Sequence, residues 1–306
     1  MGLISCYNEL AVQLSEKSLC SNYKNVSNSV SPNLTPSIQT AATNIYKTTL
    51  STGIRHLITV TWCRNAATQG LQINSGDDTA AAFRLNTNSR LFRKKKGSKA
   101  FEINNSKFEV FYDLSAAQYG GGAEPVGKYY VLIMVDSELG LFLGDMSEEA
   151  AFKKVKTQKQ NAKFSLVSRR EHFYGNTLYS TKAQFSDAGS CHDILIRCTG
   201  EGDDVKNPTL SVCIDKRVVI RVKRLQWNFR GNQTIFVDGL SVDLMWDVHD
   251  WFFTSGSDSG SGSGSGHGVF MFKTRNGLDN RLWLEDKVKT KYENKEFSLI
   301  VYATKS

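Results

Sequence analysis

Long apolar runs and the short motifs of many well-known enzyme classes are missing from this sequence. No stretch of about 18 apolar residues occurs, which excludes a membrane-spanning helix. There is no P-loop, no glycine pattern of a dinucleotide site, no GxSxG, no HExxH and no EF-hand loop. These absences remove the familiar nucleotide-dependent, metal-dependent and serine-hydrolase classes. We therefore expect no cofactor.

Metal-ligand and disulfide patterns are also absent. The six cysteines form no CxxC pair and show no ligand spacing, so the sequence predicts no metal site and favours free thiols in a reducing compartment. Residues 1–30 lack the basic start and apolar stretch of a secretion signal, so we expect a cytoplasmic protein. The opening Met-Gly-Leu-Ile-Ser-Cys resembles a myristoylation signal but carries Cys6 where Ser or Thr is required, which leaves lipidation open.

What the sequence does contain is enough apolar material for a packed core. Hydrophobic residues make up 40% and aromatic residues 11% of the chain, with only 4 prolines, which excludes wholesale disorder. The net charge of +8 permits contact with nucleic acid, an anionic membrane or an acidic partner, and establishes none of them.

Short segments rich in β-branched and aromatic residues follow one another along most of the chain. Arg55–Trp62 is one example, and Leu240, Val242, Leu244 and Trp246 alternate so that they share one strand face. Tight-turn dipeptides separate many of these segments: Asn104-Asn105, Asp136-Ser137, Asp215-Lys216 and Asp238-Gly239. The pattern predicts an all-β protein, an antiparallel sandwich or barrel.

Changes in composition divide this β pattern. We expect two β units joined by one short helix, which Ser147 can cap. The Ser/Gly-rich stretch near the C-terminal end predicts a flexible loop. The predicted parts are a disordered arm over 1–42, a first β unit over 43–146, the connecting helix over 147–160, and a second β unit over 161–306 that contains the flexible loop 255–268.

Two histidines with nearby carboxylates are the candidates for acid/base chemistry. His192 is followed by Asp193, and Asp247 and His249 are spaced to share a strand face; His172 is a further candidate. A carboxylate beside an imidazole orients it and raises its pKa, which suits a general acid or base. The alternative, which we favour for each pair alone, is a hydrogen-bonded pair that closes a β corner.

Basic residues cluster in two regions. Arg93, Lys94, Lys95, Lys96 and Lys99 form a dense run beside a turn, which suits either a solvated hairpin tip or a contact with phosphates, and also resembles a nuclear address. In the other region Arg221 and Lys223 share a strand face.

Aromatic residues follow this second basic region. Trp227 and Arg230 come directly after it, and Trp246 and Trp251 stand further along the chain. Trp and Arg together suit a binding surface that stacks planar groups, whereas in an all-β protein alternating aromatics are more often core. These four residues are the candidate binding residues.

The stretch from Thr59 to Tyr302 resembles a plant family catalogued only as domain of unknown function 868. The segments that carry the resemblance most specifically are Val222-Lys223-Arg224-Leu225-Gln226-Trp227-Asn228-Phe229-Arg230-Gly231-Asn232 and Trp246-Asp247-Val248-His249-Asp250-Trp251. The resemblance implies a plant origin and an all-β fold, and it transfers no catalytic residue. The sequence departs from the family pattern at Asn88-Ser89-Arg90, where a Pro-Trp pair is usual, and at Tyr112, where Trp is common.

Three functional hypotheses remain. The first is a binding module that recognises a small molecule or a protein partner without turnover. The alternative is an unusual small-molecule enzyme, in which acid/base groups in a β-lined cavity assist a cyclisation, isomerisation or elimination. The third, nucleic-acid binding, rests on the basic runs alone and is disfavoured; it would go with a nuclear location. The sequence leaves the oligomeric state and any ligand open.

Overall fold

A computed structural model of the chain describes residues 36–65, 69–76, 82–86, 95–147, 149–150, 153, 162–175, 178–186, 189–199, 208–253, 266–275 and 296–304. Almost all regular structure in these residues is antiparallel strand, so the all-β prediction is confirmed. None of the sheets that they form closes into a barrel. They contain no helix that is long and apolar enough to cross a membrane.

The chain divides into two compact units, which are described separately. The first unit comprises Ile38–Phe173 and Lys295–Val301, and the second comprises Met1–Ser37, Tyr174–Asn294 and Tyr302–Ser306. The predicted partition at residues 147–160 stays a prediction, because most of that segment lies outside the described residues.

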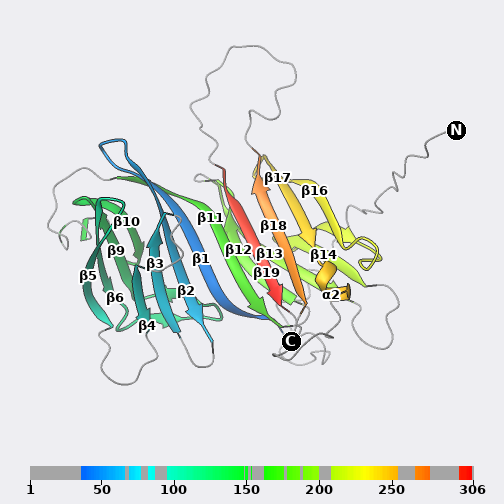
Figure 1. The fold of residues 1–306 in the computed structure, drawn as a ribbon. Helices are drawn as coiled ribbons and strands as arrows, with labels where there is room; N and C mark the ends of the chain where they lie inside the picture. The colour runs from blue at the N-terminus through cyan, green and yellow to red at the C-terminus, as the bar shows by residue number, and fades with distance from the viewer. Residues whose placement is uncertain are drawn as a thin grey trace, which may run out of the picture. The chain divides into compact units, whose positions relative to one another are not determined.

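The first unit contains two larger sheets (Figure 1). One has the strand order β19-β11-β1-β2-β3-β4, formed by the start of β19 (Ser298–Thr304) with β11 (Lys163–Tyr174), β1 (Ile38–Thr49), β2 (Arg55–Arg64), β3 (Gln69–Ser75) and β4 (Phe83–Asn86). The other has the order β10 (Glu138–Gly144), β9 (Tyr130–Val135), β6 (Ser106–Asp113) and β5 (Lys96–Ile103). The short strands β7 (Gln118–Tyr119) and β8 (Pro125–Gly127) pair with each other.

Alternating apolar residues build the core of the first unit. Ile58, Val60 and Trp62 on β2 belong to the same buried cluster as Phe108 and Val110 on β6, so the inner faces of the two sheets pack as a sandwich. The hairpin between β5 and β6 turns at Asn104 and Asn105, whose φ angles of 49° and 61° fit a type I′ turn, as predicted.

The second unit also contains two sheets. One has the order β12 (Leu178–Gln184), β13 (Cys191–Thr199), β14 (Thr209–Ile214) and β15 (Arg217–Val222). The other contains β16 (Arg230–Val237), β17 (Leu240–Asp247) and β18 (His267–Thr274), with the short helix α2 (His249–Phe253) after β17. Tyr179 on β12 contacts Phe270 of β18, and Phe185, directly after β12, contacts Phe272 of β18, with ring centroids 6.5 and 6.4 Å apart.

Several predicted boundaries need correction. Residues 38–42, predicted to belong to a disordered arm, lie in β1, and His267 and Gly268, predicted to end the flexible loop, lie in β18. In the predicted helix, Glu149, Ala150 and Lys153 are helical, and the Ala150 N–H donates to Ser147 Oγ at 3.3 Å, as expected of a capping serine. The remainder of that helix and residues 255–265 of the loop lie outside the described residues.

The cysteines are partly as predicted. Cys63, Cys191 and Cys198 are not in disulfides. Cys213, predicted to be free, is disulfide-bonded, which corrects that prediction.

Candidate functional site

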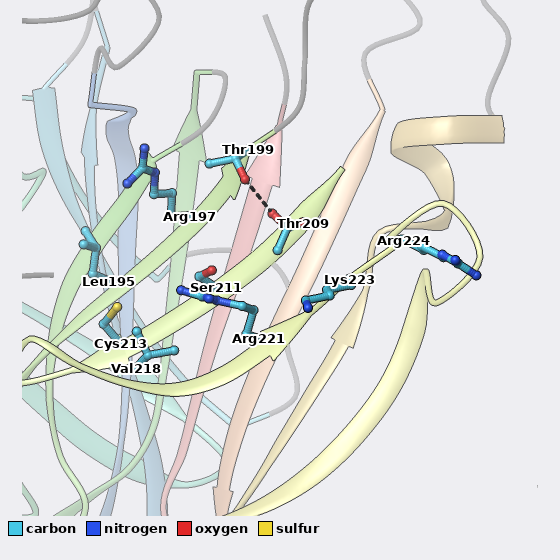
Figure 2. Close-up of a pocket in the computed structure, with 10 residues that line it drawn as sticks. All are labelled: Leu195, Arg197, Thr199, Thr209, Ser211, Cys213, Val218, Arg221, Lys223 and Arg224. Atoms are coloured by element: carbon cyan, nitrogen blue, oxygen red, sulfur yellow. Dashed lines mark hydrogen bonds between the residues drawn. The ribbon is translucent and has the colours of Figure 1, made fainter. Parts of the chain in front are cut away.

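The sheet formed by β12–β15 buries one face and leaves the other hollowed. Because side chains alternate along a strand, Ile194, Ile196, Val212 and Ile220 face the core and are at most 1% exposed. Residues on the opposite face of β13, β14 and β15 line a hollow of about 400 Å³ (Figure 2).

The register of the three strands orders the lining residues into rows. Leu195, Cys213 and Val218 are cross-strand partners and form an apolar row. Arg197 and Arg221 both pair with Ser211, so the next row places a hydroxyl between two guanidinium-bearing residues.

A third row completes the hollow. Thr199 pairs with Thr209, and the Thr199 hydroxyl donates to the Thr209 carbonyl at 3.4 Å. Lys223, directly after β15, lies beyond this hydrogen bond (Figure 2).

A β-bulge in β15 determines which of its residues line the hollow. Val212 pairs with Ile220 while the next residue, Cys213, pairs with Val218, so Val219 is an extra residue in β15. The sequence alternation predicts that Val218 shares a face with Ile220. The bulge instead places Val218 on the hollow's side with Arg221, which is a correction to the simple period-two pattern.

The hollow is strongly basic. Four of its lining residues are basic, Arg197, Arg221, Lys223 and Arg224, and none of its lining residues is Asp or Glu. Arg224 points away from the other side chains, and Arg221 extends beside Ser211 (Figure 2). Arg197, Arg221 and Lys223 are taken together as the basic centre of the hollow.

Two buried donors in this centre are unsatisfied. Nε of Arg197 and Nη2 of Arg221 are shielded from solvent and have no hydrogen-bond partner among the described residues. A buried donor without a partner costs free energy. The arrangement therefore favours an acceptor, above all an anionic one, in the hollow.

Comparison with known proteins places the chain in a family. A family model described as plant protein of unknown function (DUF868) matches residues 37–305. The chain belongs to this family. No curated protein and no solved structure matches it. The family match includes the strands of the hollow, but its description names no activity, so the function has to be argued from the residues themselves.

The sequence suggested that His192 pairs with the neighbouring Asp193, but in the structure it does not. Its Nδ1 lies 2.6 Å from Asp215 and its Nε2 lies 2.9 Å from Asp238. The Asp193 carboxylate instead contacts Lys182 at 3.1 Å. Since ionised carboxylates only accept hydrogen bonds, both contacts are hydrogen bonds only when both ring nitrogens donate, so the geometry favours the protonated imidazole.

The pKa values agree with this geometry. Burial alone lowers the pKa of His192, but the hydrogen bonds that its ring forms with the Asp215 and Asp238 carboxylates outweigh burial and raise that pKa. An imidazole that is protonated and bonded on both sides has no free nitrogen with which to accept a proton. The arrangement suits a clasp between two turns better than a general base.

The second histidine pair is also arranged differently from the sequence expectation. Asp247 ends β17, whereas His249 begins α2, so they do not share a strand face. The Asp247 carboxylate accepts from the His249 backbone N–H at 3.0 Å and from Arg230 Nε at 2.8 Å. The His249 ring contacts Asp250 at 3.0 Å instead. His172 is exposed on β11, in the other unit.

The four predicted binding residues, three tryptophans and one arginine, do not form one cluster. Trp246 is 3% exposed and donates to the Asn228 carbonyl, and Trp251 donates to the Ala303 carbonyl and stacks on Tyr179. Arg230 pairs with Asp247. Trp227 is largely exposed, at 76%, and Arg230 is exposed as well. None of the four lines the hollow.

The predicted basic run lies in the other unit and is partly paired. Arg93 and Lys94 lie outside the described residues. Lys96 pairs with Asp113 at 3.0 Å, and Lys99 donates to the Ala82 carbonyl at 3.3 Å, while Lys95 is exposed. The described side chains contain no group of three or more His, Cys, Asp or Glu that could hold a metal ion.

A buried ionic cluster in the first unit has no local signal in the sequence. Arg169 on β11 contacts Glu171 at 2.5 Å and Glu124 at 2.9 Å, and it also donates to Asn44 on β1. Glu171 is 0% exposed, and its Oε2 has no partner among the described residues. Burial, and next the Glu124 carboxylate, raise the pKa of Tyr46 beside this cluster.

This cluster helps to hold the glycine-rich segment 120–124. Arg64 donates to the carbonyls of Gly120 and Gly122, at 2.6 and 3.1 Å, and Gln39 accepts from the Ala123 N–H. Together with the Glu124 contacts, these bonds fasten the segment to β1, β2 and β11. We therefore interpret these contacts as structural.

Proposed function

We propose that this chain is a binding module that takes an anionic ligand in the hollow of β13–β15. The observation that carries the proposal is a pair of buried guanidinium nitrogens, from Arg197 and Arg221, that have no partner among the described residues; the two residues flank Ser211 across the strands. An oxyanion between them would accept from both guanidinium groups and from the hydroxyl.

The geometry supports a compact anionic group at this position. Neighbouring strands lie about 4.8 Å apart, so the Cα atoms of Arg197 and Arg221, on either side of β14, are about 10 Å apart. Arginine side chains are long enough to meet over that distance: Arg221 already extends beside Ser211, and Arg197 would reach the same point by a change of side-chain rotamer (Figure 2). Charge-assisted hydrogen bonds from arginine to carboxylate or phosphate oxygens are roughly twice as strong as neutral ones. With no acidic lining residue as a competitor, the ligand itself supplies the balancing charge.

The test is calorimetric titration of the full chain with inorganic phosphate at low ionic strength. We expect saturable binding that weakens about tenfold in Arg197→Met and in Arg221→Met, because each loses charge-assisted hydrogen bonds. Arg217→Met is the matched control: Arg217 is exposed, lies on the same strand as Arg221 and does not line the hollow.

Two results would contradict the proposal. One is the absence of saturable phosphate binding by the unaltered chain. The other is an equal loss in Arg217→Met, which would show that total charge rather than the hollow governs the interaction.

A further inference from the structure

The hollow has an apolar side as well as a basic centre. Leu195, Cys213 and Val218 form a continuous row across three strands, next to the row of Arg197, Ser211 and Arg221. Same-face rows in a strand are two residues apart, which is about 7 Å. A short carbon chain attached to an anion between the two arginines would therefore reach the apolar row.

The size of the hollow points the same way. One water occupies about 30 Å³ of liquid, so an oxyanion with four oxygens takes on the order of 100 Å³. The hollow measures about 400 Å³. This volume lies in the range of pockets that hold organic ligands, roughly 300–1,000 Å³. An inorganic anion would leave most of it, including the apolar row, filled with water.

We propose that the ligand is an amphiphilic organic anion, with its charged head between Arg197 and Arg221 and its apolar part against Leu195, Cys213 and Val218. This inference rests on the proposed anion-binding function and adds the ligand class to it. The sulfur of Cys213 contributes an apolar surface as part of a disulfide. The head is a carboxylate or a phosphate monoester, since both present oxygens to guanidinium groups.

The test compares inorganic phosphate, methyl phosphate, butyl phosphate and phenyl phosphate, and in parallel acetate, butanoate and benzoate, by titration of the full chain. We expect affinity to rise about fourfold per methylene until the apolar row is covered, because each buried methylene leaves water. The series whose shortest organic member binds with the higher affinity identifies the head group.

Two variants test whether the rise in affinity with chain length comes from the apolar row. Val218→Thr keeps the shape of the side chain but makes it polar, and we expect it to lose most of the dependence on chain length while its affinity for inorganic phosphate changes less than about twofold. Val219→Thr is the matched control, because Val219 is the bulge residue next in sequence and does not line the hollow. Retained phosphate binding shows that the variant is folded.

The outcomes separate this inference from the proposed function. Phosphate binding that requires Arg197 and Arg221 but gains nothing with chain length overturns the amphiphilic ligand and leaves the anion site standing. Chain-length dependence that Val218→Thr leaves intact also overturns it. Failure of every anion to bind overturns both.

Discussion

Nε2 of His192 on β13 lies 2.9 Å from the Asp238 carboxylate in the turn between β16 and β17. The other ring nitrogen contacts Asp215 in the turn between β14 and β15, at 2.6 Å. One imidazole thus connects two hairpin turns within the second unit.

This clasp predicts a pH dependence of stability. The folded pKa of His192 is raised, so its contribution is fully present below the unfolded value of about 6.5 and is lost as pH rises through the folded pKa. The pKa values of Asp215 and Asp238 are lowered, so their contribution is present above about 3.9 and is lost as pH falls through the folded values. Stability should therefore be greatest between these limits.

Urea denaturation of the unaltered chain and of His192→Gln from pH 3 to pH 9 measures this dependence. The variant should be less stable at about pH 6 and should lose much of the decline above it. His172→Gln, at an exposed position, is the control and should keep the parent profile. Parallel profiles for the parent and His192→Gln would show that the clasp does not titrate as described.

Arg169 should be essential to the stability of the first unit. Arg169→Met leaves the fully buried Glu171 carboxylate without its partner, which costs about 3–5 kcal/mol of unfolding free energy. Replacing Glu171 by Gln in the same variant should recover part of the loss by removing the uncompensated charge. Arg170→Met, at the exposed neighbouring position, should change stability by less than about 0.5 kcal/mol. Urea denaturation that gave equal losses at the two positions would refute the role of the buried pair.

Gly231 should tolerate no side chain. It pairs across the strands with Trp246, and a Cβ at this position would lie 2.2 Å from Trp246 Cζ2. Gly231→Ala should therefore displace the indole, cost about 1–3 kcal/mol and change tryptophan fluorescence. Gly121, where a Cβ would meet nothing within 4 Å, supplies the control Gly121→Ala. Indistinguishable unfolding midpoints for the two variants would contradict this packing.

The basic run of the other unit should not take part in anion binding in the hollow. Lys96 is paired with Asp113, and Lys99 donates to a backbone carbonyl. We expect the triple variant Lys95→Gln, Lys96→Gln, Lys99→Gln to bind phosphate within about twofold of the parent chain, since none of the three lysines lines the hollow. A loss comparable to that of Arg221→Met would locate the anion site on this run instead.

The sequence predicts the all-β class and several turns because these depend on local chemistry. Asn104-Asn105 and Asp238-Gly239 mark hairpins, and the structure shows positive φ angles at all four residues. Alternation along β17 likewise identifies its buried residues, since Val242, Leu244 and Trp246 are all buried.

The candidate site depends on information that is not local. The row of Arg197, Ser211 and Arg221 exists only through the pairing of three strands, and the bulge at Val219 interrupts the alternation from which faces are inferred. His192 finds its partners 23 and 46 residues away, whereas Asp193, its neighbour in sequence, points to the opposite face. The one usable signal was the shared face of Arg221 and Lys223, both of which line the hollow.

The most direct test of the central claim is a phosphate titration of the full chain followed by NMR, with ¹⁵N-labelled arginine side chains and backbone amides. We expect the Nε–H signals of Arg197 and Arg221 and the amide of Ser211 to shift together and saturate at one phosphate concentration. Shifts confined to the lysines of residues 95–99, or spread without saturation over exposed basic residues, would contradict an anion site in the hollow.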